Sequence, residues 1–381
     1  MGPGAGEVQG TCDERFEKVR DVLAANLDRG VDVGASVAVN LDGDTVVDIW
    51  GGWADEDRTR PWEAGTITNV WSTTKTMTNL CALILADAGE VDVDAAVSRY
   101  WPQFAAAGKR DLVLVRHLLA HTSGLAGWTA PMVTEDFYDW EKCTSLLAAQ
   151  EPWWEPGTAS GYHAVTQGYL VGEVVRRVTG QSLGEFFRQN VAGPLGADFH
   201  IGLPPEADDR VAPVIPPPPL GADLELGEIG LRCLGNPLLD ARASWAEEWR
   251  RAEIPAAGGH GNARSVVAIQ AAVANGGQAG GKRLLSAAGC EKILTEQSYG
   301  EDLVLGVPIR FGIGYGLPSP EMPLSPSSRA CFWGGWGGSV IVRDMDVHLT
   351  VSYMMNKMGE GTLGDERGAG IVQAAYESLA G

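Results

Sequence analysis

The chain has 381 residues, of which 45% are hydrophobic and 20% charged, so it can bury a large core without disulfides or bound metals. Its formal charge of −20 repels nucleic acid and anionic lipid, which argues against both as partners. No apolar run is long enough to span a membrane, no signal peptide is evident, and the six cysteines include no Cys-x-x-Cys pair, so we expect reduced thiols in a cytoplasmic protein.

The N-terminal part of the chain predicts a helix followed by a hairpin. Apolar residues recur at helical spacing from Phe16 to Leu23. Two runs rich in β-branched residues, 35–39 and 45–50, then flank the dipeptide Asp42-Gly43. Asp-Gly between such runs is typical of a tight turn that joins two antiparallel strands.

The middle of the chain, from about 76 to 297, has mostly helical periodicity, which is clearest at 168–178 and 263–273. Two proline-rich segments, 202–205 and 213–219, favour extended loops rather than linkers between independent units. Sheet elements therefore bracket a helical insertion.

The C-terminal part mirrors the N-terminal part. Strand-like runs at 339–343 and 347–353 are separated by a turn around 344–346, and a helix is expected from about 371 to 379. We expect the strands from both ends of the chain to share one antiparallel sheet.

Ser72 and Lys75 are the first candidates for chemistry. Residues i and i+3 of a helix are surface neighbours, so the lysine amine can take the serine proton. A serine needs such a base, and a lysine can serve only if its pKa is lowered by burial or by neighbouring cations. The apolar run 80–85 that follows would supply the burial. Taken alone, the tetrapeptide fits a serine helix cap beside a solvated lysine equally well.

The surrounding motifs decide between these interpretations. In chain order they are Arg116–Leu125, Glu155–Thr158 with Tyr162, Gly168–Val175, Asn190–Gly196, Gly259–Ser265, Phe311–Gly316 and Trp333–Ser339. Together with Ser72 and Lys75 they resemble the serine β-lactamase and penicillin-binding-protein superfamily, especially its class C branch and the related family VIII carboxylesterases. The resemblance covers nearly the whole chain.

This resemblance implies an α/β, β-lactamase-like fold, in which an antiparallel sheet is flanked by N- and C-terminal helices and carries a large helical insertion. We expect residues 1–75 and 301–381 to form the sheet domain and residues 76–300 the helical domain.

The same resemblance assigns the catalytic roles. Ser72 is the acylated nucleophile, and Lys75 and Tyr162 share the acid and base work, with the phenol held partly ionised beside the ammonium. The backbone N–H groups of Ser72 and Trp336 would form the oxyanion hole. No cofactor and no metal is implied.

Two departures from the lactamase pattern bear on the substrate. Trp333, Gly334 and Gly335 occupy the third motif, where lactamases usually carry Lys-Thr-Gly and the esterases often His-x-Gly or Trp-x-Gly. Ala164 stands two residues after the tyrosine, where class C lactamases have asparagine. Both changes remove polar contacts, and Trp333 adds apolar area, which favours neutral, apolar acyl groups.

Other candidates carry less weight. Trp128 and Trp154 can line an acyl pocket, or they can belong to an ordinary core. His117 and His121 have the i, i+4 spacing of a metal-binding helix, but no third ligand is evident, so we expect them to be structural.

The function expected from these residues is hydrolysis of small-molecule carboxylic esters through an acyl-enzyme on Ser72, with at most slow turnover of β-lactams. An acyltransferase of the same fold, similar to the lovastatin-type enzymes, would pass the acyl group to an amine or alcohol. The two share their chemistry up to the acyl-enzyme, so the motifs leave both open, as they do the natural acyl donor and the oligomeric state. The intact Ser72, Lys75 and Tyr162 argue against a catalytically idle binding protein.

Overall fold

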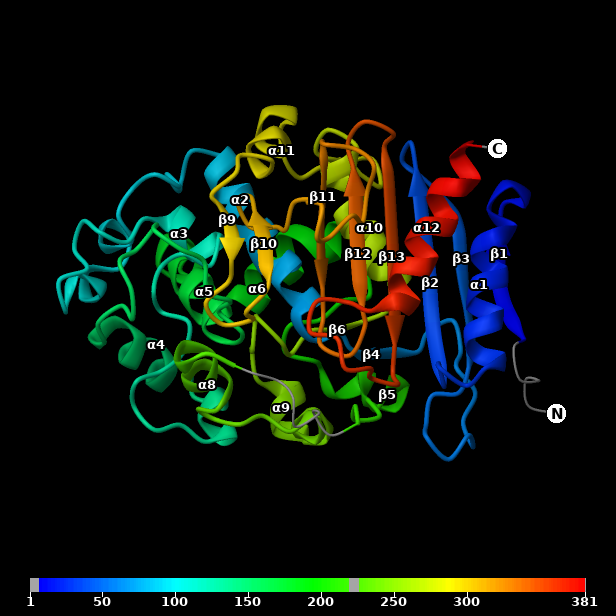
Figure 1. Ribbon diagram of the computed structural model, residues 1–381, viewed down its shortest axis with the longest axis horizontal. Coiled ribbons are helices and arrows are strands. Elements are labelled where there is room, and N and C mark those ends of the chain that lie inside the picture. The colour runs from blue at the N-terminus through cyan, green and yellow to red at the C-terminus, as the bar shows by residue number, and fades with distance from the viewer. Residues whose placement is uncertain (1–6, 219–225, 381) are drawn as a thin grey trace.

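The computed structural model describes residues 7–218 and 226–380 (Figure 1). The start of the chain, where a signal peptide would lie, and Pro219 of the expected proline-rich loop fall outside the described residues. None of the helices in this described part is both long and apolar enough to cross a membrane.

A six-stranded antiparallel sheet forms one half of the molecule, with strand order β1-β3-β2-β13-β12-β11. Its strands are β1 (Val8–Cys12), β2 (Gly34–Leu41), β3 (Asp44–Gly52), β11 (Ala330–Gly334), β12 (Val340–Asp344) and β13 (Leu349–Met355). β13 pairs with β2, so the N- and C-terminal hairpins share one sheet, as predicted. The blue strand β2 and the orange strand β13 accordingly lie side by side in Figure 1.

The turn between β2 and β3 confirms the expected hairpin. Asp42 and Gly43 have φ values of 53° and 93°, and two left-handed residues in succession are the signature of a type I′ turn. The backbone twist of this turn matches that of the strands it joins.

Helices cover both faces of the sheet. α1 (Glu17–Asp28) and α12 (Glu366–Ala380) pack together on one face, and α10 (Ala263–Ala274) contacts β2, β12 and β13 on the other, behind the sheet in Figure 1. α12 begins at Glu366 rather than near 371.

The expected boundaries of the two domains stay a prediction, although α10 falls within 76–300 and nevertheless packs against the sheet. Periodicity shows that a helix has an apolar face, but it does not show which layer that face will cover.

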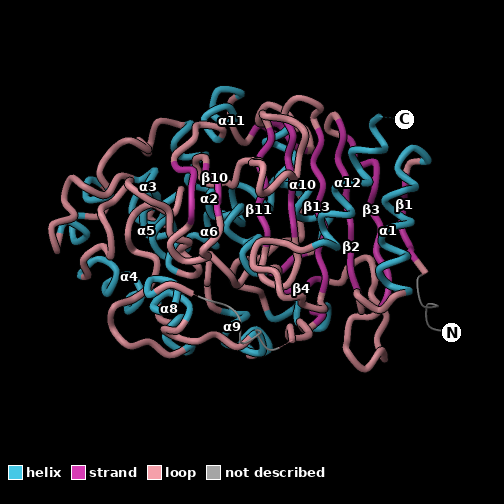
Figure 2. Tube along the Cα trace, in the orientation of Figure 1, coloured by secondary structure: helices cyan, strands magenta, loops and turns pink. Residues whose placement is uncertain are grey.

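The other half of the molecule is mostly helices and long loops (Figure 2). Its helices are α2 (Thr74–Asp87), α3 (Val115–Leu119), α4 (Trp140–Ala149), α5 (Thr166–Thr179), α6 (Leu183–Phe187), α7 (Gly193–Leu195), α8 (Glu228–Leu234), α9 (Glu247–Arg251) and α11 (Ala287–Ile293). Short strands complete it: β4 (Ile67–Asn69), β5 (Val211–Ala212), β6 (His260–Gly261), β7 (Gln278–Ala279), β8 (Lys282–Arg283), β9 (Ser298–Glu301) and β10 (Pro308–Phe311).

α2 is the central helix of this half. It is buried along nearly its whole length and packs against α5, α6 and α11. A 3-10 turn, Trp71–Thr73, precedes it and contacts β11 of the large sheet. The N-terminal end of α2 therefore lies where the sheet meets the helical half.

Two glycines of the β2–β3 hairpin offer a test of backbone packing. A β-carbon on Gly52 (φ 79°) would lie 2.1 Å from the carbonyl oxygen of Val33, whereas one on Gly43 (φ 93°) would meet nothing within 4 Å. Both alanine variants incur the strain of a left-handed conformation, about 1–2 kcal/mol, but only Gly52→Ala also forces backbone aside. We expect Gly52→Ala to lower the free energy of unfolding in urea by at least about 3 kcal/mol. Equal losses in the two variants would contradict this packing.

Candidate active site

Ser72 lies in the 3-10 turn at the start of α2 and is 7% exposed. The residue before it, Trp71, has φ 49°, a value that bulky residues rarely adopt. Its indole ring packs 5.6 Å from that of Trp249 and 5.0 Å from that of Trp336. Tight aromatic packing thus holds the strained turn that presents the Ser72 hydroxyl.

Lys75 lies one helical turn after the serine and is completely enclosed. Its Nζ is 3.0 Å from Ser72 Oγ, 2.7 Å from the carbonyl oxygen of Ala164 and 2.9 Å from that of Ala256. Burial lowers the pKa of Lys75 well below its usual value. A neutral amine has two N–H groups, which the two carbonyls accept, and one lone pair, which is left for the proton of Ser72.

Tyr162 approaches the same oxygen from another direction, and its hydroxyl donates to Ser72 Oγ at 2.5 Å. Burial raises the pKa of Tyr162, so the phenol is neutral at rest. The expectation of a partly ionised phenol is therefore wrong for the resting site. An ammonium would have favoured the anion, but burial lowers the pKa of Lys75, and on the phenol desolvation outweighs the opposing hydrogen bond to Ser72.

A layer of aromatic rings supports Tyr162 from behind. Trp333 stacks on His121 at 5.4 Å with an interplanar angle of 9°, and both rings lie within 6 Å of the tyrosine ring. Asp302 Oδ1 accepts the backbone N–H of Tyr162 at 2.9 Å. Burial holds the pKa of His121 well below its usual value, so this layer is uncharged.

The turn between β11 and β12 lies against the Ser72 turn. A β-carbon on Gly335 would be only 2.5 Å from the carbonyl oxygen of Val70 and 3.3 Å from the nitrogen of Ser72. Ser339 Oγ donates to the Val70 carbonyl at 3.1 Å and is 3.0 Å from the Thr73 hydroxyl, which then donates to it. These contacts bring the backbone on either side of Trp336 next to the nucleophile.

A cavity of about 160 Å³ opens beside Ser72 and Tyr162. Most of its lining is apolar and comes from Trp71, Ala164, Val165, Leu234, Leu239, Ala257 and Trp336, among others. Leu238 also lines it and is 77% exposed, so apolar surface continues outward from the cavity.

This architecture matches a known group of enzymes. The sequence model of the family described as Beta-lactamase matches residues 19–376. The chain belongs to the beta-lactamase family. It is 34% identical over 375 residues to "Esterase/beta-lactamase LipL" of Mycobacterium tuberculosis, with 94% of this chain and 85% of that protein covered.

Two solved structures of the superfamily have the same fold throughout. A "family VIII carboxylesterase" is 43% identical with a TM-score of 0.93, over 98% of this chain and 100% of its own. A penicillin-binding protein homologue from Caulobacter crescentus is 38% identical with a TM-score of 0.93, over 98% and 100% of the two chains. The predicted superfamily and fold are confirmed.

Within this beta-lactamase fold, the structure brings Ser72, Lys75 and Tyr162 together as expected, but it does not bring three of the predicted tryptophans to the cavity. Trp128 is buried in the core, where its indole N–H donates to the carbonyl of Cys143. Trp154 donates to Ala159 and packs edge-on to His163. Trp333 lies behind Tyr162. The presence of a tryptophan in the sequence did not show whether its side chain lines the cavity or lies in the core.

The two glycines of the third motif are also packed against protein. A β-carbon on Gly334 would lie 2.2 Å from the backbone of Leu363, and one on Gly335 would meet the Ser72 turn. Their place in the beta-lactamase site is to let the backbone approach closely, and neither lines the cavity beside Ser72.

His117 and His121 do not share a helix face. α3 ends at Leu119, and His121 has φ 60°. His117 Nδ1 accepts the N–H of Leu114, and His121 Nδ1 accepts that of His163. Across residues 7–218 and 226–380 no group of three His, Cys, Asp or Glu could hold a metal ion.

The outer wall of the cavity comes from a segment that sequence reasoning missed. α8 and the loop after it contribute Leu234, Leu238 and Leu239. Asn236 anchors this wall, because its amide donates to the carbonyls of Trp128 (2.8 Å) and Ala130 (2.9 Å) and accepts the N–H of Met132 at 2.8 Å. The only local signal is an Asn-Pro dipeptide, which indicates a turn but no partner.

We therefore expect Asn236→Ala to lower the free energy of unfolding by about 2 kcal/mol, because it leaves inward-facing backbone groups without partners. The matched control is Asn190→Ala, whose amide donates only to the carbonyl of Phe186 within its own helical segment, at 3.0 Å. That variant should lose less than about 0.5 kcal/mol. Urea unfolding measures both, and similar losses would contradict the anchoring role.

Proposed function

We propose that this protein is a serine esterase that cleaves small-molecule carboxylic esters through an acyl-enzyme on Ser72. The observation that carries the proposal is the convergence of Lys75 Nζ and the Tyr162 hydroxyl on one serine oxygen beside an apolar cavity. The names of two similar proteins, an esterase/beta-lactamase and a family VIII carboxylesterase, support it.

In the acylation step, Lys75 takes the Ser72 proton and Oγ attacks the ester carbonyl carbon. The carbonyl oxygen becomes an oxyanion, for which we propose the N–H groups of Ser72 and Trp336 as donors. When the tetrahedral intermediate collapses, the leaving alkoxide takes the proton of Tyr162. The site then holds a phenolate and an ammonium that stabilise each other, since Lys75 Nζ lies 4.8 Å from the centre of the Tyr162 ring.

Deacylation restores the resting state. A water molecule attacks the acyl carbonyl and gives its proton to the Tyr162 phenolate. The second tetrahedral intermediate expels Ser72 Oγ, which recovers its proton from the Lys75 ammonium. Protons balance over the cycle, with one ester and one water consumed and one acid and one alcohol released.

The lining of the cavity defines the substrate class. None of the described residues that line it is an arginine or a lysine, so no cation is placed to bind a substrate carboxylate. Ala164 belongs to the lining at the position where class C lactamases have asparagine. Neutral esters with apolar acyl groups fit this lining best, and β-lactams should turn over slowly.

The same apolar lining favours a second candidate, acyl transfer. Trp71 and Trp336 line the cavity beside Ser72, and a water-poor site would favour an amine or alcohol over water as the acyl acceptor. The two candidates differ only in the acceptor.

We further propose the reducing cytoplasm as the compartment, since all six cysteines are free thiols.

Intact-mass analysis tests the nucleophile. We expect a p-nitrophenyl ester of a short aliphatic acid to give an acyl adduct on Ser72 and turnover, both lost in Ser72→Ala. Adding an amine or alcohol should leave the rate of acid release unchanged if the enzyme is a hydrolase, and divert product if it transfers. Neither adduct nor turnover above the Ser72→Ala background, across several esters, would refute the proposal.

A second prediction concerns the charge of Lys75. A lysine that is neutral when folded and charged when unfolded makes the unfolded chain bind one more proton, so stability rises with pH up to the unfolded pKa of about 10.5. The unfolding free energy of the wild type should therefore rise with pH relative to that of Lys75→Met, by up to about 1.4 kcal/mol per pH unit, above the lowered pKa of the folded lysine and below about pH 10. Equal slopes would show a protonated Lys75 and exclude it as the base.

The acid role of Tyr162 has its own test. Tyr162→Phe keeps the ring against Trp333 but removes the proton donor, so kcat should fall by about 10²–10⁴. The loss should be smaller for p-nitrophenyl esters than for alkyl esters, because nitrophenolate leaves without a proton. A loss independent of the leaving group would contradict this role.

A further inference from the structure

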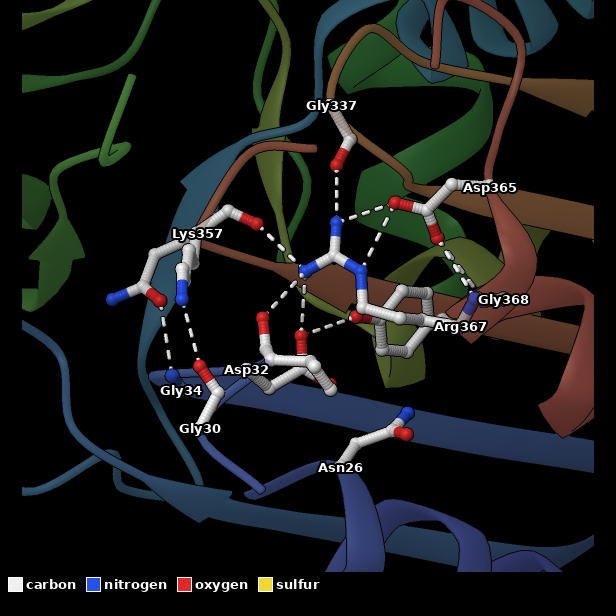
Figure 3. Close-up of polar contacts among 12 residues, drawn as sticks. Asn26, Gly30, Asp32, Gly34, Gly337, Lys357, Asp365, Arg367 and Gly368 are labelled. Carbon is white, nitrogen blue, oxygen red and sulfur yellow. Dashed lines mark hydrogen bonds and ion pairs between the residues drawn. The ribbon is translucent and has the colours of Figure 1, made fainter. Parts of the chain in front are cut away.

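Arg367, in the first turn of α12, forms the centre of a polar cluster that reaches Gly337 in the β11–β12 turn (Figure 3). Its guanidinium Nη2 donates to the carbonyl oxygen of Gly337 at 2.6 Å and to Asp365 Oδ2 at 2.5 Å. Nη1 donates to Asp32 Oδ1 and to the carbonyl of Lys357, both at 2.8 Å. The side chain is only 11% exposed, so these bonds are shielded from water.

The two carboxylates fix the guanidinium in place. Asp32 is completely buried, and its Oδ1 also accepts the hydroxyl of Tyr353, which lies in β13, at 2.6 Å. Asp365 precedes α12 and accepts from both Nε and Nη2 of Arg367. The cluster thus joins the segment before β2, strand β13 and the start of α12.

The peptide that Arg367 holds lies next to the proposed oxyanion hole. Gly337 follows Trp336 directly, and with Gly338 it forms a turn in which both residues have positive φ, 93° and 126°. These glycines have no side chains to fix the turn. Within the turn, the N–H of Gly338 donates to the carbonyl of Gly335 at 3.1 Å. The peptides of Gly337 are held from outside: its N–H donates to Gly361 at 2.8 Å, and its carbonyl accepts from Gly359 at 2.7 Å as well as from Arg367.

The packing around this turn is tight. A β-carbon on Gly338 would lie 2.4 Å from Asp365 Oδ2 and 2.6 Å from Arg367 Nη2. The guanidinium and its carboxylate therefore occupy the space into which the turn would otherwise relax. The Gly337 carbonyl shares its peptide with the N–H of Gly338, which donates to the carbonyl of Gly335 at 3.1 Å. That carbonyl in turn shares its peptide with the Trp336 N–H, so a shift of the peptide held by Arg367 would also move the N–H of Trp336.

We propose that Arg367 is a positioning residue for the oxyanion hole: held by Asp32 and Asp365, it fixes the Gly337 carbonyl and so aims the Trp336 N–H toward the oxyanion formed at Ser72. The inference rests on the proposed esterase function and adds a residue that never touches substrate. A purely structural ion-pair cluster would change stability, but it would not change how well the site discriminates an anionic tetrahedral ligand from a neutral ester.

The experiment compares Arg367→Gln and Arg367→Lys with wild type on a p-nitrophenyl ester and with an alkylboronic acid, which forms a tetrahedral anion on a serine. Removing an oxyanion-hole donor outright costs about 10²–10³ in kcat, so a misaimed donor should cost about 10- to 100-fold. We expect that fall in kcat for Arg367→Gln, with KM within about 2-fold and boronate affinity falling in parallel with kcat/KM. Arg367→Lys, which keeps the charge, should recover part of the loss.

The matched control is Arg329→Gln, which removes an arginine that also bridges two carboxylates, Glu291 and Asp346, but on the surface. It should leave kcat, KM and boronate affinity unchanged. If Arg367→Gln does not fold, as judged by its near-UV circular dichroism, Asp365→Asn serves instead, because it weakens the anchor and leaves the bond to Gly337.

Wild-type boronate affinity in a folded Arg367→Gln or Asp365→Asn variant would overturn the inference. Losses of ester turnover and boronate affinity in Arg329→Gln as large as those in Arg367→Gln would also overturn it. Failure of the esterase function is a different result, because it shows as the absence of any Ser72 adduct in the wild type.

Discussion

The burial of the Lys75 amine is the constraint on which the site depends. An amine in the interior is costly unless its hydrogens have partners. Here two carbonyls supply them, one from Ala164 just before α5 and one from Ala256 between α9 and β6. Three separate segments must therefore meet at one nitrogen. The enclosure that this requires also lowers the pKa of the lysine, so packing and basicity have the same cause.

The opposite shifts of Lys75 and Tyr162 follow from that enclosure. Burial disfavours the charged form of each group, which lowers the pKa of the amine and raises that of the phenol. Both are neutral at rest, and neither charge has to be buried alone. In the proposed mechanism, charge appears only during reaction, as an ammonium and a phenolate together. Neighbouring titratable groups whose pKa values are shifted in opposite directions are typical of acid–base catalytic sites.

The sequence was informative where the pattern is local. Hairpins at both ends, their shared sheet and the Ser72-Lys75 spacing all depend on short-range periodicity or on ordered motifs, and the structure contains them. The sequence was uninformative where the burial of a side chain depends on which other segment packs against it. Trp128 and Trp333 are large apolar side chains in either a core or a pocket wall, and only their packing against Tyr169 and His121 places them in the core. For the wall formed by α8 and the loop after it, the Asn-Pro dipeptide indicates a turn but not its partner, because the position of the wall depends on hydrogen bonds from Asn236 to the loop at Trp128 and Ala130.

Trp333 lies behind Tyr162 rather than at the cavity surface. At the cavity surface it would have added an apolar contact in place of the lactamase lysine. Behind Tyr162 it instead forms part of an uncharged aromatic layer with His121 and Phe311. That layer helps to keep the tyrosine dry, so the substitution acts through acid–base chemistry as well as recognition. The proposed preference for neutral esters then has two sources. The cavity offers no cation to an anionic substrate, and a charge placed beside Lys75 and Tyr162 would disturb the neutral resting state on which both proposed steps depend.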